Sequence, residues 1–97
     1  MSKGKIYIAG KISGDPNYKA KFTLREEQLK KEGYIVLKPS NLPLGFTDDE
    51  YIHICKSMID VCDSVYFIND WIYSTGSIIE MEYAKNNNKN IIIEKGE

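Results

Sequence analysis

Glu80 is the residue whose type and position in this sequence most favour catalytic chemistry. At about 100° per residue, it falls within the apolar stripe of a helix predicted from about Gly76 to Asn87. The stripe consists of Gly76, Ile79, Tyr83 and Ala84. A carboxylate on a core-facing stripe is costly to bury unless it is paired or used, and an early helical position favours its ionised form. These properties suit a nucleophile that attacks a sugar carbon.

A structural role for Glu80 is the alternative interpretation. Ser77 and Glu80 have the spacing of a capping box, in which the glutamate only closes the start of a helix. Tyr7 bears on this choice, because it belongs to the first predicted strand and its hydroxyl needs a partner if the ring is buried. Glu80 is a candidate partner, whereas Glu82 is expected to point away from the stripe into solvent.

A glycine-bounded loop after the first predicted strand is a candidate anion site. Gly10 and Gly14 enclose Lys11 and Ser13, which offer a cation and a hydroxyl beside the start of the next helix. Glycines let the backbone approach a ligand, and a helix N-terminus favours anions. The loop matches neither a dinucleotide-binding glycine motif nor a P-loop, so a simple tight turn is the alternative.

Four other residues have both a functional and a structural interpretation. Asp70 and Trp71 follow the third predicted strand, where a ligand crevice is expected, and Trp71 either stacks on a base or sugar or covers the core. Asp63, at a junction of helix and strand, either ligates something or caps backbone amides. His53 lies beside an apolar helical face and is expected on the surface.

The two cysteines, Cys55 and Cys62, are predicted to be free thiols. Two helical turns separate them by about 10.5 Å along the axis, which is too far for a disulfide. A zinc site needs more ligands than these cysteines and the single histidine can supply. We therefore expect core packing in a reducing cytoplasm, with no metal and no cofactor.

The composition predicts one domain over residues 1–97. The 13 Lys and Arg balance 14 Asp and Glu to a net charge of −1, whereas binders of nucleic-acid polymers or membrane surfaces are usually basic. No apolar run approaches the roughly 20 residues of a membrane span, and the first residues lack the pattern of a signal peptide. A cytoplasmic protein without a membrane or nucleic-acid partner is therefore expected.

The elements that must position these residues alternate along the chain. Strands are expected at residues 5–9, 34–38, 65–68 and 90–94, and helices at about 15–33, 47–62 and 76–87. The first helix should begin at Asp15 and Pro16, and the second at a capping box of Thr47 and Glu50. This alternation predicts an α/β fold with a parallel sheet and right-handed crossovers. Ligands of such sheets bind at the carboxyl ends of the strands, here the loops at 10–15, 39–46 and 69–75.

The motifs of this chain resemble those of a known superfamily. The order IYIAG, then S-x-G-x-x-x-E-x-x-x-A, then a closing apolar strand resembles the nucleoside 2-deoxyribosyltransferase-like superfamily. It is also similar to the smaller 2′-deoxynucleoside 5′-monophosphate N-glycosidases, and to a branch of short proteins common in phages and bacteria. The resemblance spans nearly the whole chain. It implies a flavodoxin-like or Rossmann-like three-layer sandwich with about four parallel strands, and a homo-oligomer.

The resemblance also implies roles for individual residues. The family's catalytic glutamate, which attacks C1′ and releases the base, falls on Glu80, and the tyrosine that positions it falls on Tyr7. Ser74 stands where the transferases carry aspartate and the monophosphate glycosidases serine, which favours a substrate with a 5′-phosphate. The implied substrate site comprises Gly10, Lys11, Ser13, Gly14, Asp70, Trp71, Ser74 and Gly76.

Two departures from the family pattern bear on activity. Cys55 occupies the position of an aspartate that helps protonate the leaving base, a contribution of typically 10²–10⁴-fold, and Glu82 replaces a glycine. Despite these departures, the resemblance implies N-glycosidic cleavage, or 2-deoxyribosyl transfer, on a nucleoside or nucleoside 5′-monophosphate. A non-catalytic nucleotide-binding protein, possibly phage-encoded and acting in the host cytoplasm, is the second hypothesis, and a structural role is the third.

An apolar side of the third helix predicts self-association. Ile78 and Met81 are expected on the side away from the core-facing stripe, where exposed apolar residues favour a subunit contact. A homodimer or larger assembly through this helix is therefore expected.

Overall fold

Four parallel strands form the centre of the molecule. The computed structural model describes residues 2–95 and contains one sheet with the strand order β2-β1-β3-β4. The strands are β1 (Gly4–Ala9), β2 (Tyr34–Leu37), β3 (Ser64–Phe67) and β4 (Asn90–Ile93), and every neighbouring pair is parallel. The predicted α/β fold with a four-stranded parallel sheet is confirmed.

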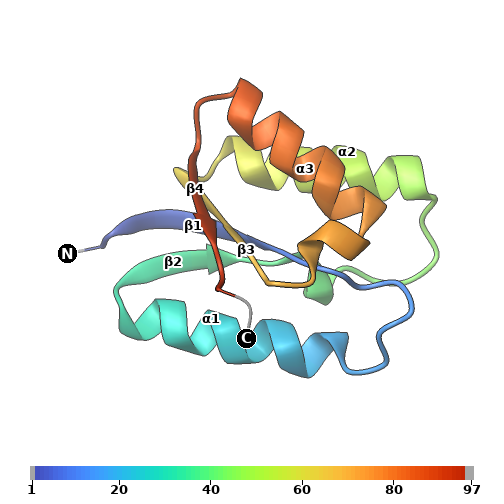
Figure 1. The fold of residues 1–97 in the computed structure, drawn as a ribbon, viewed down its shortest axis with the longest axis horizontal. Coiled ribbons are helices and arrows are strands. Elements are labelled where there is room, and N and C mark those ends of the chain that lie inside the picture. The colour runs from blue at the N-terminus through green and yellow to red at the C-terminus, as the bar shows by residue number, and fades with distance from the viewer. Residues whose placement is uncertain (1, 96–97) are drawn as a thin grey trace.

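Three helices cover the two faces of this sheet (Figure 1). Helix α1 (Tyr18–Lys31) lies on one face, and α2 (Asp48–Asp60) and α3 (Thr75–Asn86) lie together on the other. Two short 3-10 turns, η1 (Pro39–Asn41) and η2 (Trp71–Tyr73), follow β2 and β3. The result is the expected three-layer sandwich. No helix among residues 2–95 is both long enough and apolar enough to cross a bilayer.

Strand β1 supplies the core on both sides because successive side chains point to opposite faces. Ile6 and Ile8 pack toward α1 with Phe22, and Tyr7 and Ala9 pack toward α2 and α3. These four side chains are fully buried. Tyr7 therefore lies on the face of the sheet from which α2 and α3 approach.

Helix α1 begins later than the sequence predicted. The expected start at Asp15 and Pro16 is wrong, because Oδ1 of Asp15 accepts a hydrogen bond from the amide of Asn17 and closes a separate turn. The helix starts at Tyr18. The predicted capping box of α2 is confirmed: Oγ1 of Thr47 accepts from the amide of Glu50, whose carboxylate accepts from the amide of Thr47.

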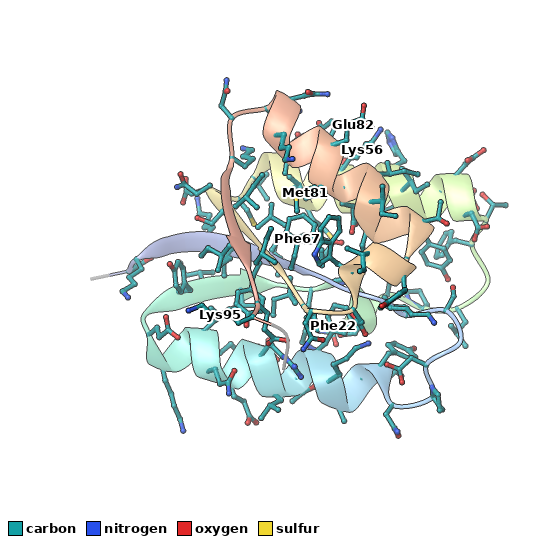
Figure 2. All side chains as sticks on the ribbon, in the orientation of Figure 1. Phe22, Lys56, Phe67, Met81, Glu82 and Lys95 are labelled. Atoms are coloured by element: carbon teal, nitrogen blue, oxygen red, sulfur yellow. The ribbon has the colours of Figure 1, made fainter. Side chains whose placement is uncertain are left out.

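Helix α3 is rotated relative to the predicted stripe. Its buried residues are Ser77, Glu80, Met81 and Ala84, so the expectation that Met81 is exposed is wrong. Met81 joins the core with Phe67, since α3 contacts both α2 and the sheet and buries a wider sector than one stripe. Figure 2 shows Met81 on the inner side of α3 and Glu82 on its outer side. Ile78 remains exposed at 46%.

The strand order fixes where a ligand can bind. The chain passes from β1 outward to β2, then crosses over to β3 on the other side of β1. This reversal makes the carboxyl ends of β1 and β3 the topological switch point, the usual ligand crevice of an open parallel sheet.

Candidate active site

A cavity of about 510 Å³ lies at the carboxyl end of β1, on the side covered by α2 and α3. Each of the three loops selected from the sequence contributes to its walls: residues 10–13, Pro39 with Leu42 and Leu44, and Tyr73 to Thr75. One face of α2 and the first turns of α3 complete it. A cavity thus lies where the carboxyl-end rule predicts the ligand crevice.

Glu80 and Tyr7 meet at the inner end of this cavity. The hydroxyl of Tyr7 donates a hydrogen bond of 2.7 Å to Oε2 of Glu80. Glu80 lines the cavity but is only 7% exposed, and Tyr7 is fully buried. The capping-box interpretation of Glu80 is wrong, because α3 starts one turn earlier, with Oγ of Ser74 accepting from the amide of Ser77. Glu80 therefore lies in the second turn, with its carboxylate turned inward.

Burial controls the protonation of this carboxyl group. Desolvation raises the pKa of Glu80 to about 7, even though the hydrogen bond from Tyr7 and the thiol of Cys55 act to lower it. Burial also raises the pKa of Tyr7 well above its usual value and that of the Cys55 thiol to about 12. Near neutral pH, Tyr7 and Cys55 are thus protonated donors around a carboxyl group that titrates between its neutral and ionised forms.

The loop after β1 contributes most of its predicted residues to the cavity. Gly10, Lys11 and Ser13 line it. Gly10 packs on Ile68, whose nearest side-chain atom would lie 3.0 Å from an added Cβ, so a larger residue at this position requires Ile68 to shift. Gly14 is not in the cavity wall; its φ of +81° shows that it is needed for the turn instead.

Asp70 and Trp71 do not reach the cavity, so the expectation that they line the crevice is wrong. Asp70 accepts hydrogen bonds from the amide of Lys11 and from Nζ of Lys21, at 3.1 and 2.5 Å, and so ties the first loop to α1. Trp71 packs edge-on against Phe67, with ring centroids 5.4 Å apart. Its core-covering alternative is the one found, because η2 folds the ring back onto β3.

The serine and glycine of the S-x-G motif both lie in the cavity wall. Ser74 caps α3 with its hydroxyl oxygen, and Gly76 follows in the first turn. Gly76 leaves room beside Ser74, since an added Cβ would be 3.9 Å from its Oγ. The first turn of α3 shares the cavity wall with Lys11 and Ser13, and a helix N-terminus is an environment that favours anions.

Three of the four residues that α2 contributes to the cavity, Asp48, Tyr51 and Ile52, are not identified from the sequence. Asp48, Ile52 and Cys55 line the cavity at helical spacing of four and three, and Tyr51 stands beside them. Their spacing places Asp48, Ile52 and Cys55 on one face of the second predicted helix, and only Cys55 is named from the sequence as a possible functional residue. Tyr73 gave no signal, because an exposed aromatic residue in a short loop has no periodicity to follow.

The remaining candidate residues, Asp63, His53 and Cys62, do not line the cavity. Oδ2 of Asp63 accepts a hydrogen bond from the amide of Lys5, the capping alternative named above. His53 is exposed, and Cys62 is in the core. Both cysteines are free. Among residues 2–95, no three His, Cys, Asp or Glu side chains come together in a group suited to a metal ion.

Comparison with known proteins supports the α/β fold and shows the family of the chain. A solved structure, that of a 2-desoxiribosyltransferase from Leishmania mexicana, superposes with a TM-score of 0.74 over 92% of this chain, at 21% sequence identity. At that identity the likeness concerns the fold, and this chain spans 62% of the length of the other. No curated protein matches the sequence. The chain belongs to the family described as domain of unknown function DUF4406, which matches residues 4–93.

Proposed function

We propose that the protein acts on the N-glycosidic bond of a nucleoside or nucleoside 5′-monophosphate, with Glu80 as the nucleophile. The observation that carries this proposal is the buried Glu80 carboxylate in a cavity wall, held by the hydroxyl of Tyr7. A carboxylate fixed on a rigid helix, beside a cavity large enough for a small ligand, is suited to attack at a sugar carbon.

The reaction proceeds in two displacements at C1′. First, a carboxylate oxygen of Glu80 bonds to C1′ while the bond from C1′ to the base nitrogen breaks, and the departing base takes that electron pair and a proton from solvent water. Then water, or a nitrogen of a second base, attacks C1′ and loses a proton, and Glu80 leaves as the carboxylate. Water gives hydrolysis, and a second base gives transfer of the sugar.

The ends of the cavity suit the other parts of such a substrate. Lys11, Ser13 and the first turn of α3 provide a cation, a hydroxyl and amide donors for a 5′-phosphate. Tyr51, Ile52 and Leu44 provide an apolar and aromatic wall for the base. Tyr7 acts through Glu80 and is a positioning residue in this scheme.

The test is the release of free base from a panel of ribo- and deoxyribonucleosides and their 5′-monophosphates. We expect turnover by the wild type and a loss of at least about 10³-fold in Glu80→Gln, as for removal of a nucleophile. Glu82→Gln is the matched control, because Glu82 is exposed on the outer side of the same helix. Equal rates for wild type and Glu80→Gln contradict the proposal.

The second candidate is a protein that binds a nucleotide without turning it over. One observation favours it: the residue beside Glu80 is a thiol whose pKa burial raises to about 12, a poor acid for protonating a leaving base. A nucleotide that raises Tm without release of base supports this candidate, since ligands of the folded state stabilise it.

A further inference from the structure

The cavity wall contains a hydroxyl group whose hydrogen-bonding capacity is unused. Ser77 lines the cavity and is only 1% exposed, and its Oγ has no hydrogen-bond partner among residues 2–95. Among residues 2–95, the other buried hydroxyl without a hydrogen-bond partner is that of Ser40, which does not line the cavity. An unpaired buried hydroxyl is destabilising, so one in a cavity wall is explained if a ligand supplies its partner.

Ser77 and Glu80 are neighbours on the inner face of α3. Both are among the buried residues of this helix, and residues three apart have Cβ atoms about 5–6 Å from each other. Helical side chains tilt toward the N-terminus, so Ser77 lies on the side of Glu80 that faces Gly76 and the start of the helix. A sugar that extends from Glu80 toward the first turn of α3 must pass Ser77.

The stereochemistry of the displacement fixes which side of the sugar faces α3. A nucleophile approaches C1′ from the face opposite the departing base. In a natural β-nucleoside, the 2′- and 3′-hydroxyls project from that same face. A sugar with C1′ at Glu80 therefore turns its hydroxyls toward α3, and Ser77 is the next inward side chain along the helix.

We propose that Ser77 is a specificity-determining residue that recognises a sugar hydroxyl on the face attacked by Glu80. A rotation about χ1 turns Oγ from its buried position toward the cavity, where it exchanges a hydrogen bond with the 2′- or 3′-hydroxyl. This inference rests on the proposed function, because that function places C1′ at Glu80. A sugar without the recognised hydroxyl leaves Oγ unpaired and binds less well.

The test combines one variant with three sugars. The kcat/KM for base release is measured for ribonucleoside, 2′-deoxyribonucleoside and 3′-deoxyribonucleoside 5′-monophosphates, with wild type and Ser77→Ala. We expect Ser77→Ala to lower kcat/KM about three- to tenfold for sugars that carry the recognised hydroxyl, the usual effect of one neutral hydrogen bond. The sugar that lacks it should be processed equally by both proteins, which identifies the 2′- or the 3′-position.

Ser40→Ala is the matched control, since it removes an equally unpaired hydroxyl outside the cavity. It should leave all three kcat/KM values unchanged, and the ligand-free Tm of both alanine variants should not fall below that of the wild type. A loss in Ser77→Ala that is the same for all three sugars, or no loss at all, overturns the inference while the proposed function stands.

Absence of base release by the wild type instead contradicts the proposed function. The ligand-induced rise in Tm, measured with the same three nucleotides, then decides the role of Ser77. A rise that depends on the sugar in the wild type but not in Ser77→Ala supports sugar recognition. Equal rises in the two proteins, or no rise with any nucleotide, overturn it.

Discussion

The phenol of Tyr7 donates a 2.7 Å hydrogen bond to Oε2 of Glu80 and so joins the central strand to the second turn of α3. The two residues are 73 positions apart in the chain. Because both side chains are buried, the carboxylate has one defined orientation toward the cavity, and its protonation depends on few neighbours.

Activity should depend on the ionisation of Glu80. Burial raises the pKa of this carboxyl group to about 7, and only the ionised form is a nucleophile. We expect kcat/KM for base release to rise with pH through an inflection near 7 and then level off. A pH–rate profile between about pH 5 and 9 measures this, and a profile without an inflection in that range contradicts the assignment.

Tyr7→Phe should move that inflection upward. The hydrogen bond from Tyr7 acts to lower the pKa of Glu80, so its loss leaves burial less opposed. Hydrogen bonds to charged groups contribute about 1.5–3 kcal/mol, which corresponds to a shift of about one to two pH units. The variant should lose more activity at pH 7 than at pH 9.

Tyr66→Phe is the control for this shift. Tyr66 also donates to a carboxylate, that of Glu94, but on the α1 side of the sheet. Its substitution should leave the inflection where it is in the wild type. If Tyr7→Phe lowers kcat/KM equally at every pH, the hydroxyl of Tyr7 does not act through the ionisation of Glu80.

Glu80→Gln should stabilise the protein at high pH. The pKa of Glu80 is about 7 in the folded protein against 4.5 for the unperturbed group, so between these values the folded state binds more protons than the unfolded state. The free energy of unfolding therefore falls as pH rises through this window, by on the order of 3 kcal/mol in total. Glutamine keeps an acceptor for Tyr7 and carries no charge to bury.

Denaturation of both proteins at several pH values tests this point. The advantage of Glu80→Gln should be largest near pH 8 and should disappear below about pH 4.5, where Glu80 is neutral in both states. Glu82→Gln, on the exposed side of α3, should show no such dependence. If Glu80→Gln is less stable than the wild type at pH 8, the prediction is wrong, and interactions of the ionised carboxylate outweigh the cost of burying its charge.

Self-association through α3 remains a prediction. The exposed apolar surface available for the contact is smaller than the sequence indicated. Met81 is in the core, but Ile78 on α3 and Ile72 and Tyr73 in η2 are exposed. Exposed apolar side chains on adjoining elements favour a contact between copies. We expect a homo-oligomer by light scattering at tens of micromolar and its dissociation by Ile78→Glu. Leu24→Glu, at an exposed apolar position on α1, is the control, and a monomeric wild type removes the proposal.

The sequence predicted the features that depend on local physics. Alternating periodicities gave the order of strands and helices, the Thr47 capping box gave the start of α2, and a carboxylate on an apolar stripe indicated an inward-facing Glu80. These inferences hold because hydrogen-bond capping and side-chain direction are set within a turn or two of the chain. The carboxyl-end rule then located the three loops of the cavity without any coordinates.

Tertiary structure decided which side chains of those loops face the cavity. Trp71 packs on Phe67, and Asp70 pairs with Lys21 of α1, whereas Tyr73, only two residues later than Trp71, lines the cavity. The burial of Met81 and the approach of Asp48 likewise depend on how α2 and α3 lie against each other and the sheet. Short loops and wide helix faces have no periodicity of their own. The direction of their side chains is set by packing between elements that are distant in the chain. A local sequence pattern does not contain that information.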